Sequence, residues 1–454
     1  MFLRIFIFCS SLLVFDKITS MKTLTVAATG DSLMVDRFPE CYAADRAAIR
    51  DYLASADVRI TNLETNIGSF GGFASAYSGG TWLNTEPEAF ESMLEYGFNY
   101  YGTANNHSMD YAYGGLLSTI KNLKVRGLAF SGTGRSLAEA GKPAVIKTAA
   151  GRVGVIAVTT TFDNASRAGR KSLGSVARPG VNYVRSIRYY AISPEDMKLL
   201  SEVADRSGIN AYHKLMIAEG FDKPEEKGVF AFGKALFCAD GSKRASECNK
   251  ADLKRVVDSI RAAKKKFSAV FVLLHCHEID GVEQCDVPAF LKELAHACVE
   301  AGASAIFGGG AHELRPMEIY NGAPIFYSLG DFIYQGMLVK YLPADFMEKY
   351  GMPDDATALE GLMARSKGGK IGLQTKLANF LTVIPKMTFE DGVLKSLELL
   401  PVDLAFDRKD TRKGLPRVAK GKTAKDIFER LSRLSAPYGT RLQLKNGRIV
   451  PEIP

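Results

Sequence analysis

Long hydrophobic runs are what this sequence most clearly lacks. Beyond residue 20, no apolar stretch approaches the roughly 20 residues of a membrane-crossing helix, so the sequence predicts no such helix there. Internal repeats and low-complexity segments are also absent, which excludes repeat architectures. The 454 residues are 46% hydrophobic and 24% charged, which is typical of a globular protein with one large or two ordinary domains.

Cysteine is scarce and irregularly placed. The seven cysteines form no Cys-x-x-Cys pair and their number is odd. This pattern argues against the disulfide framework of small secreted domains. A single bridge between Cys238 and Cys248 stays open if the protein is exported.

Charge of one sign is not in large excess. The net charge is +8, which is modest for 454 residues. The one dense basic run, Lys264–Lys266, lies at the end of an expected helix, where cations interact favourably with the helix dipole. We therefore expect no nucleic-acid partner.

The N-terminus has two interpretations. Residues 3–15 contain one arginine and a short apolar core, as in a weak signal peptide. Ile18-Thr19-Ser20 is a poor cleavage site, and Met21 is followed at once by a good strand, as if residues 1–20 were an overlong start. The compartment, cytoplasmic or exported, therefore stays open, and we expect the fold to span residues 21–454 as a single domain.

Strand-like and helical segments alternate after Met21, which predicts an α/β fold. The expected strands are Thr23–Ala28, Val58–Asn62, Tyr100–Gly102, Gly127–Phe130, Ala144–Thr148, Arg152–Thr160, Ala269–Leu274 and Ala305–Phe307. The expected helices are Ala44–Leu53, Pro87–Tyr96, Tyr113–Lys124, Pro194–Ser207, Ala251–Lys265, Val287–Ala301 and Thr423–Leu434. Hairpins are expected at Asn321-Gly322 and at Asp391-Gly392. Residues 162–250 are less regular, and we interpret them as a lid or specificity insertion.

The stretch from Ala305 to Tyr334 stands out chemically. Its buried strand ends in the glycines 308–310, and His312 follows directly. α/β enzymes place metal ligands and catalytic groups on such loops. A turn that happens to contain a histidine would look the same in isolation.

Polar residues follow other expected strands in the same way. They are Asp31, Glu64, Asn106, His107, His275, His277 and His312, which include four of the six histidines. In an open α/β sheet these ends converge on one edge, the usual site of ligands. Mixed Asp, Glu, Asn and His ligands suit Mn²⁺, Fe or Zn²⁺, and such an ion activates water and polarises phosphoryl or carbonyl oxygens.

Each of these residues also has an ordinary structural explanation. Asp31 could cap a helix, Asn105-Asn106 could form a plain turn, and His275 could be a hydrogen-bonded core residue. His213 and His296 fall within expected helices and are assigned to surface or packing roles. It is the recurrence at successive strand ends that favours a site.

These motifs resemble the CapA family of capsule and poly-γ-glutamate synthesis proteins, within the calcineurin-like metallophosphatase superfamily. The matching segments are Gly30–Met34 with Arg37, Asn62–Glu64, Ala104–His107 with Asp110, Arg178–Asn182, His275–Glu278 and Ala305–Tyr334. They run in order from about Thr23 to the C-terminus. The last is similar to the family's G-H-x-P-H and E-x-Y-x-G-x-P-I-F-Y-S-L-G patterns.

The resemblance implies a four-layer α/β/β/α sandwich with metal at the sheet edge, completed by residues 377–454. By this resemblance, the metal ligands would be Asp31, Glu64, Asn106, His275 and His312. His107 would be the general acid, oriented by Asp110. Arg178, with Asn105, would bind an anionic substrate group, since guanidinium pairs bidentately with carboxylate or phosphate.

One departure from the family pattern affects the metal site. Gly309 stands where the family has histidine, and Ala311 replaces the proline. His277 would compensate, because alternation along an extended segment puts it on the same side as His275. Otherwise one metal ion would bind instead of two, and restoring histidine at position 309 would raise metal occupancy.

The expected function is metal-dependent hydrolysis of a phosphoester, or of an amide in a γ-glutamyl polymer, in capsule or related bacterial envelope metabolism. The substrate would be an anionic polymer or a small anionic compound, and capsule synthase components would be partners. The alternative is a non-catalytic polymer-binding or synthase-accessory protein with a degenerate metal site. Fold alone does not decide between them.

Overall fold

The computed structural model describes residues 22–69, 72–243 and 245–453. Residues 1–20, interpreted above as a signal peptide or an overlong start, lie outside this range. Within it, no helix is both long and apolar enough to cross a membrane. Cys238 and Cys248 are both free thiols, so no bridge joins them.

The larger sheet has ten strands, ordered β23-β24-β21-β20-β1-β2-β5-β6, with β19 beside β1 and β22 beside β21. Its members are β1 (Thr23–Leu33), β2 (Val58–Leu63), β5 (Tyr100–Gly102), β6 (Ala129–Ser131), β19 (Asp331–Tyr334), β20 (Leu381–Glu390), β21 (Val393–Asp403), β22 (Arg417–Val418), β23 (Leu442–Lys445) and β24 (Arg448–Pro451). β1 pairs in parallel with β2 and β19, whereas β20 runs antiparallel to it. The carboxyl ends of β1 and β2 therefore meet at one edge.

The second sheet has six strands, ordered β17-β18-β16-β15-β9-β8. They are β8 (Ala144–Thr148), β9 (Gly151–Thr159), β15 (Ala269–His275), β16 (Ala305–Gly309), β17 (Met317–Tyr320) and β18 (Ala323–Phe326). Its four inner strands are parallel. β15 and β16 thus end side by side, with His275 opposite Gly309.

A shared hydrophobic core joins the two sheets. β1 contributes Val26 and Ala28, and β15 contributes Phe271 and Leu273, to the same buried cluster. Alternate residues of these strands face the other way, as strand geometry requires. Ala27 faces a cluster that includes residues of α1 (Ala43–Ala54) and α2 (Pro87–Leu94).

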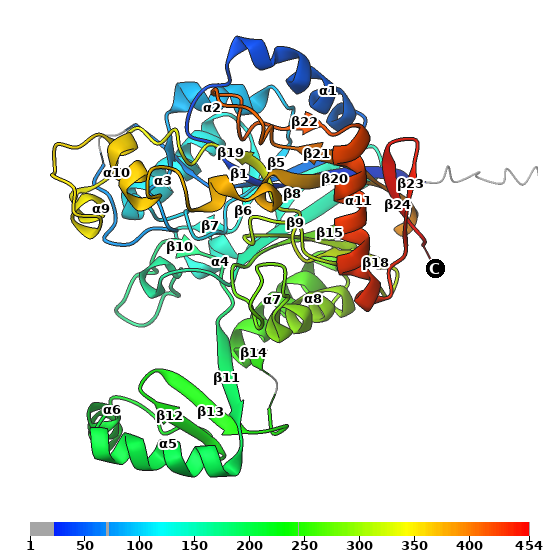
Figure 1. The fold of residues 1–454 in the computed structure, drawn as a ribbon. Coiled ribbons are helices and arrows are strands. Elements are labelled where there is room, and N and C mark those ends of the chain that lie inside the picture. The colour runs from blue at the N-terminus through cyan, green and yellow to red at the C-terminus, as the bar shows by residue number, and fades with distance from the viewer. Residues whose placement is uncertain (1–21, 70–71, 244, 454) are drawn as a thin grey trace, which may run out of the picture.

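The second sheet is covered on its outer side by α7 (Lys250–Lys264) and α8 (Ala289–Glu300). α11 (Gly421–Ser435) packs its apolar face against the core between the sheets. Figure 1 shows α1 and α2 on one side of the stacked sheets and α7 and α8 on the other. The α/β class expected from the sequence is confirmed.

A small lobe emerges from the second-sheet side. It consists of β11 (Ser186–Ile192), α5 (Pro194–Ser207), α6 (Ala211–Ala218), β12 (Val229–Phe232), β13 (Ala235–Ala239) and β14 (Ser246–Cys248). The four strands form a separate sheet, and the lobe stands away from the body in Figure 1. The sequence predicted only its first helix, because the short strands have no strong alternating pattern.

Both expected hairpin turns are present. Asn321 and Gly322 join β17 to β18, and Asp391 and Gly392 join β20 to β21. All four have positive φ angles, between 48° and 82°, as a type I′ turn requires. The remaining elements are β3 (Asn66–Ile67), β4 (Asn84–Thr85), α3 (Ala112–Val125), β7 (Thr133–Gly134), α4 (Leu137–Ala140), β10 (Gly180–Val181), α9 (Ala344–Lys349) and α10 (Ala358–Arg365).

Candidate metal centre

The predicted site residues meet where the two sheets abut. Asp31 lies in β1 opposite Asn62 of β2 and Asp331 of β19. An added Cβ on Gly30 would come within 1.8 Å of Gly330 O, so two Gly-Asp pairs approach each other closely. This approach places Asp31 and Asp331 next to each other in the buried interior.

Asp31 is held as a carboxylate. Its Oδ1 accepts a hydrogen bond from Asn62 Nδ2 at 2.7 Å, and its Oδ2 accepts one from Gly310 N at 2.6 Å. Burial alone would raise the pKa of Asp31, but its interactions with His275 and these two donors lower it overall. The side chain is therefore ionised and oriented by fixed donors.

The carboxylate of Glu64 makes no hydrogen bond within the described chain. Both carboxylate oxygens are buried, and no described residue donates a hydrogen bond to them. Burial, followed by the nearby charges of Asp31, Asp331 and Asp110, raises the pKa of Glu64 well above its usual value. Buried carboxylates are normally paired or bound to metal, so this residue fits a cation.

Two histidines converge on Glu64. His275 ends β15, and its Nε2 lies 3.4 Å from Glu64 Oε1, 2.7 Å from Asn106 Oδ1 and 3.1 Å from His277 Nε2. Ligands about 2.0–2.2 Å from one metal ion are separated by roughly 3.0–3.4 Å. His275 Nδ1, on the other side of the ring, is 3.6 Å from Asp31 Oδ1.

His277 is available as a neutral ligand. Its Nε2 lies 3.8 Å from Glu64 Oε1, and its side chain is 25% exposed, so solvent reaches this side of the cluster. Burial and the neighbouring His275, His312 and His107 hold the pKa of His277 well below its usual value. A neutral imidazole keeps the lone pair that metal binding needs.

His312 is oriented by Asp331. Its Nδ1–H donates to Asp331 Oδ1 at 3.0 Å, which leaves Nε2 free. Burial opposes the charged form, but the Asp331 carboxylate outweighs it and raises the pKa of His312. The backbone of His312 is left-handed, with φ 57°, a conformation that is uncommon outside glycine.

Two groups of side chains in the described chain could hold a metal ion. One consists of Asp31, Glu64 and His275, and the other of Glu64, His277 and His312. Within each group the ligand atoms lie within 4.8 Å of one another. Because Glu64 belongs to both, the groups form one continuous cluster.

Gly309 has no room for a side chain. An added Cβ would lie 2.3 Å from Asp31 Oδ1 and 2.8 Å from both Asp31 Cγ and Oδ2. The Asp31 carboxylate thus occupies the space into which a residue at 309 would project. We therefore expect a histidine at this position to displace the Asp31 carboxylate instead of completing the site.

His107 and Asp110 form a pair next to the cluster. His107 Nδ1–H donates to Asp110 Oδ2 at 2.6 Å, and His107 Nε2 lies 3.9 Å from Glu64 Oε1. Asp110 also accepts hydrogen bonds from Gly79 N and Leu83 N. The imidazole is therefore fixed, with Nε2 directed toward the cluster.

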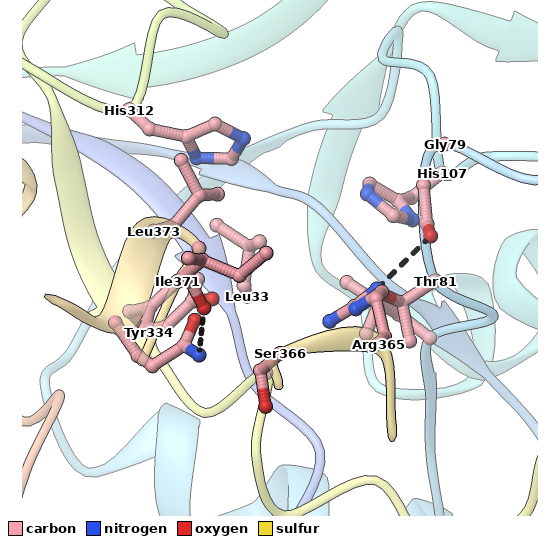
Figure 2. Close-up of a pocket in the computed structure, with 15 residues that line it drawn as sticks. Leu33, Gly79, Thr81, His107, His312, Tyr334, Arg365, Ser366, Ile371 and Leu373 are labelled. Carbon is pink, nitrogen blue, oxygen red and sulfur yellow. Dashed lines mark hydrogen bonds between the residues drawn. The ribbon is translucent and has the colours of Figure 1, made fainter. Parts of the chain in front are cut away.

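A cavity of about 280 Å³ opens beside the cluster and is lined by His107 and His312 (Figure 2). It is also lined by Arg365, the last residue of α10, and by Leu373 and Gln374. The cluster thus borders a space large enough for a small ligand or one unit of a polymer.

Comparisons with known proteins agree with these motifs. The model of the family "Bacterial capsule synthesis protein PGA_cap" matches residues 25–336. This chain belongs to that family. The resemblance to CapA proteins is thereby confirmed.

Relatives of the family differ in how much they share with this chain. "Uncharacterized protein y4sH" of Sinorhizobium fredii is 30% identical over 432 residues, covering 93% of this chain and 91% of the relative. "PGA biosynthesis protein CapA" of Bacillus subtilis is 25% identical over 253 residues, covering 56% of this chain and 47% of the relative. The crystal structure of a hypothetical protein from Thermus thermophilus has a TM-score of 0.37 and 11% identity, with 84% of this chain and 99% of that one covered. That likeness is too low to inform fold or function.

The two residues predicted to bind substrate are not among those that line the cavity. Asn105 is buried, and its amide donates to Leu63 O at 2.8 Å and to Asn62 Oδ1 at 3.2 Å, so it supports the loop. Arg178 is exposed, and its Nε donates to Arg167 O. Neither residue lines the cavity beside His107 and His312.

The structure also adds residues that the sequence did not single out. Asp331 and Asn62 hold site side chains, and Arg365 lines the cavity. The repeated Gly-Asp pair was a usable signal for Asp331. No sequence signal indicated Arg365, because residues 335–376 match none of the motifs described above.

Arg315 holds the loop that carries His277. It is only 1% exposed, and it donates to the carbonyls of Cys276, Glu278 and Gln284 at 2.8–3.2 Å. The first two of these residues flank His277. A buried guanidinium with three backbone acceptors therefore fixes the position of a candidate ligand.

Proposed function

We propose that this chain is a metal-dependent hydrolase acting on a phosphoester, or on an amide of a γ-glutamyl polymer, in capsule or related envelope metabolism. The proposed ligands are Asp31, Glu64, Asn106, His275, His277 and His312. The observation that carries the proposal is Glu64, whose two buried oxygens lack any described protein donor. A divalent ion such as Mn²⁺, Fe²⁺ or Zn²⁺ would satisfy that charge.

The fold proposed for this activity is the four-layer α/β/β/α sandwich. The core shared by the two sheets and the helix-bearing clusters on their outer faces support it. In this single domain of residues 21–454, residues 377–454 complete the layers through β20, β21 and α11. Residues 162–250 would serve as a lid or specificity insertion.

In the proposed mechanism, the six proposed ligands would hold the metal ion, which would supply Lewis acidity toward a phosphoryl or carbonyl oxygen and lower the pKa of water. His107 donates a proton from Nε2 to the leaving group, which lies in the cavity. Asp110 holds Nδ1–H, so the ring presents Nε2 and the imidazolium is stabilised. The same arrangement serves an alkoxide or an amine leaving group.

A non-catalytic role is the second candidate, and Gly309 is the observation that favours it, since the family pattern has a ligand there. The name "Probable polyglutamine synthesis accessory protein" of a Mycobacterium tuberculosis relative, 24% identical, points the same way. In that role the chain would bind an anionic polymer or synthase components without turnover.

Metal analysis and turnover separate the two candidates. Purified protein is loaded with Mn²⁺, Fe²⁺ or Zn²⁺, its metal content is measured by mass spectrometry, and hydrolysis of bis-p-nitrophenyl phosphate and γ-glutamyl-p-nitroanilide is followed. Glu64→Gln should lose both metal and turnover. Glu195→Gln, an exposed carboxylate on α5, is the matched control and should keep both. Metal without turnover of either substrate favours the accessory role, and no metal at all refutes the hydrolase.

A further inference from the structure

The cavity beside the candidate metal centre contains a cation that the proposed chemistry has not used. Arg365 lines the same space as His107 and His312 (Figure 2). The rest of the lining consists of glycines and of uncharged side chains such as Thr81, Tyr334, Ile371 and Gln374. No carboxylate is among them, so the net charge of the wall is positive.

The Arg365 guanidinium is held by neutral groups. Its Nη1 donates to Thr81 Oγ1 at 2.5 Å and to Gly80 O at 3.2 Å. The guanidinium also lies over the Phe346 ring, 5.6 Å from the ring centroid. Within the described chain, no carboxylate forms a salt bridge with Arg365, and its Nη2 and Nε have no hydrogen-bond acceptor. The charge is thus positioned but not neutralised.

The helix that carries Arg365 is well defined. α10 begins with a capping box between Thr357 and Glu360, and Arg365 is its last residue, where a cation interacts favourably with the helix dipole. The chain after it contributes Ser366, Leu373 and Gln374 to the cavity wall. One continuous segment therefore provides both the cation and part of the cavity wall.

We propose that Arg365 binds an oxyanion group of the substrate, a carboxylate or a phosphate, in the cavity that it lines together with His107 and His312. Guanidinium presents paired N–H donors that match either group, and two of its nitrogens are free to do so. The bond to be broken would then lie beside His107 and His312. This assignment rests on the proposed hydrolase function and gives Arg365 the role that the sequence suggested for Arg178.

Anion binding to the full-length protein tests the assignment. Titration calorimetry with γ-glutamylglutamate and with inorganic phosphate is done on metal-loaded and chelator-treated protein. Arg365→Gln should weaken binding of at least one probe about tenfold or more in both states, and Arg365→Lys should lose less. The probe that loses more identifies the anion as carboxylate or phosphate. Arg178→Gln, which removes the same charge from an exposed loop, should bind as the parent does.

Three results would overturn the assignment: unchanged affinity in Arg365→Gln, an equal loss in Arg178→Gln, or no binding of either probe by the parent. If Arg365→Gln does not fold, Ile371→Asp replaces it, since Ile371 lines the cavity and is 46% exposed. The added carboxylate should weaken binding by repulsion, and unchanged affinity would count against the proposal. Binding to chelator-treated protein needs neither metal nor turnover, so a failed hydrolase assay leaves this test intact.

Discussion

At the scale of single residues, Glu64 combines full burial with carboxylate oxygens that accept no hydrogen bond from a described residue. A bound cation would compensate for this burial. Because the pKa of Glu64 is raised in the fold, the folded state holds its proton more tightly than the unfolded chain does. The stability of metal-free protein should therefore fall as the pH rises above the ordinary Glu range of about 4.3.

Glu64→Gln should remove that pH dependence. At pH 8 with chelator, we expect the variant to be more stable than the parent by about 1 kcal/mol or more. The reason is that burying a charge without a hydrogen-bond donor destabilises the fold more than burying an amide does. At pH 4 the two should be similar. Thermal denaturation at both pH values checks this, and a parent as stable as the variant at pH 8 would contradict it.

Substitution of His312 should affect both metal binding and stability. His312→Ala and His312→Gly both remove a proposed ligand and leave Asp331 buried without its donor, which costs about 1–3 kcal/mol. Glycine should be less destabilising than alanine by about 1 kcal/mol, because the φ angle of 57° suits it better. Urea denaturation and metal titration measure the two effects. Parent-like metal affinity in both variants would exclude His312 as a ligand.

The Gly309 substitutions should lower metal content rather than raise it. Gly309→Ala and Gly309→His both place a Cβ against the Asp31 carboxylate. Asp31 must shift, and its hydrogen bonds with Asn62 and Gly310 are disturbed. The metal stoichiometry of the two variants and of the parent tests this prediction. More metal in the histidine variant than in the parent would support the hypothesis that glycine at position 309 leaves the metal site incomplete.

At the scale of elements, the loop after β15 depends on its supports. Thr160 and Thr161 both donate to Glu278 Oε2 at 2.8 Å, and Arg315 holds the carbonyls on either side of His277. The loop is therefore anchored from two directions. Its ligands can converge only while these anchors are present.

Arg315→Met should loosen this loop. We expect a stability loss of about 1–3 kcal/mol from the carbonyls left without donors, and weaker metal binding because His277 is no longer fixed. Arg188→Met is the control, since exposed Arg188 also donates to a nearby carbonyl, that of Ile279. Metal affinity and urea denaturation of both variants are compared, and equal losses would show that Arg315 has no specific role.

At the scale of the whole molecule, the part of the small lobe between the end of β11 and the end of β13 begins and ends at neighbouring residues. Ile192 pairs with Ala239, and Asp240 N donates to Ile192 O at 3.2 Å, so a short linker can replace residues 193–239. We expect the shortened protein to keep its metal content, because no candidate ligand lies in the lobe. If the lobe is a specificity insertion, hydrolysis of a small ester should persist while that of a polymer changes. Loss of metal on deletion would show that the lobe supports the cluster.

Much of this molecule could be predicted from its sequence. Strand and helix periodicity identified the alternating elements, and the turn residues at 321–322 and 391–392 located both hairpins, because these signals are local. The placement of Asp31, Glu64, His275 and His312 after buried strands predicted their convergence, since parallel strand ends share an edge.

Only the tertiary structure decided what surrounds those residues. The contact of Gly309 with Asp31, the histidines gathered around Glu64, and the location of Arg365 in the same cavity as His107 join segments far apart in the chain. Such contacts depend on how sheets and loops pack in three dimensions, and no local pattern encodes them. The sequence therefore determined which residues could form a site, and the packing determined which of them touch and what space they enclose.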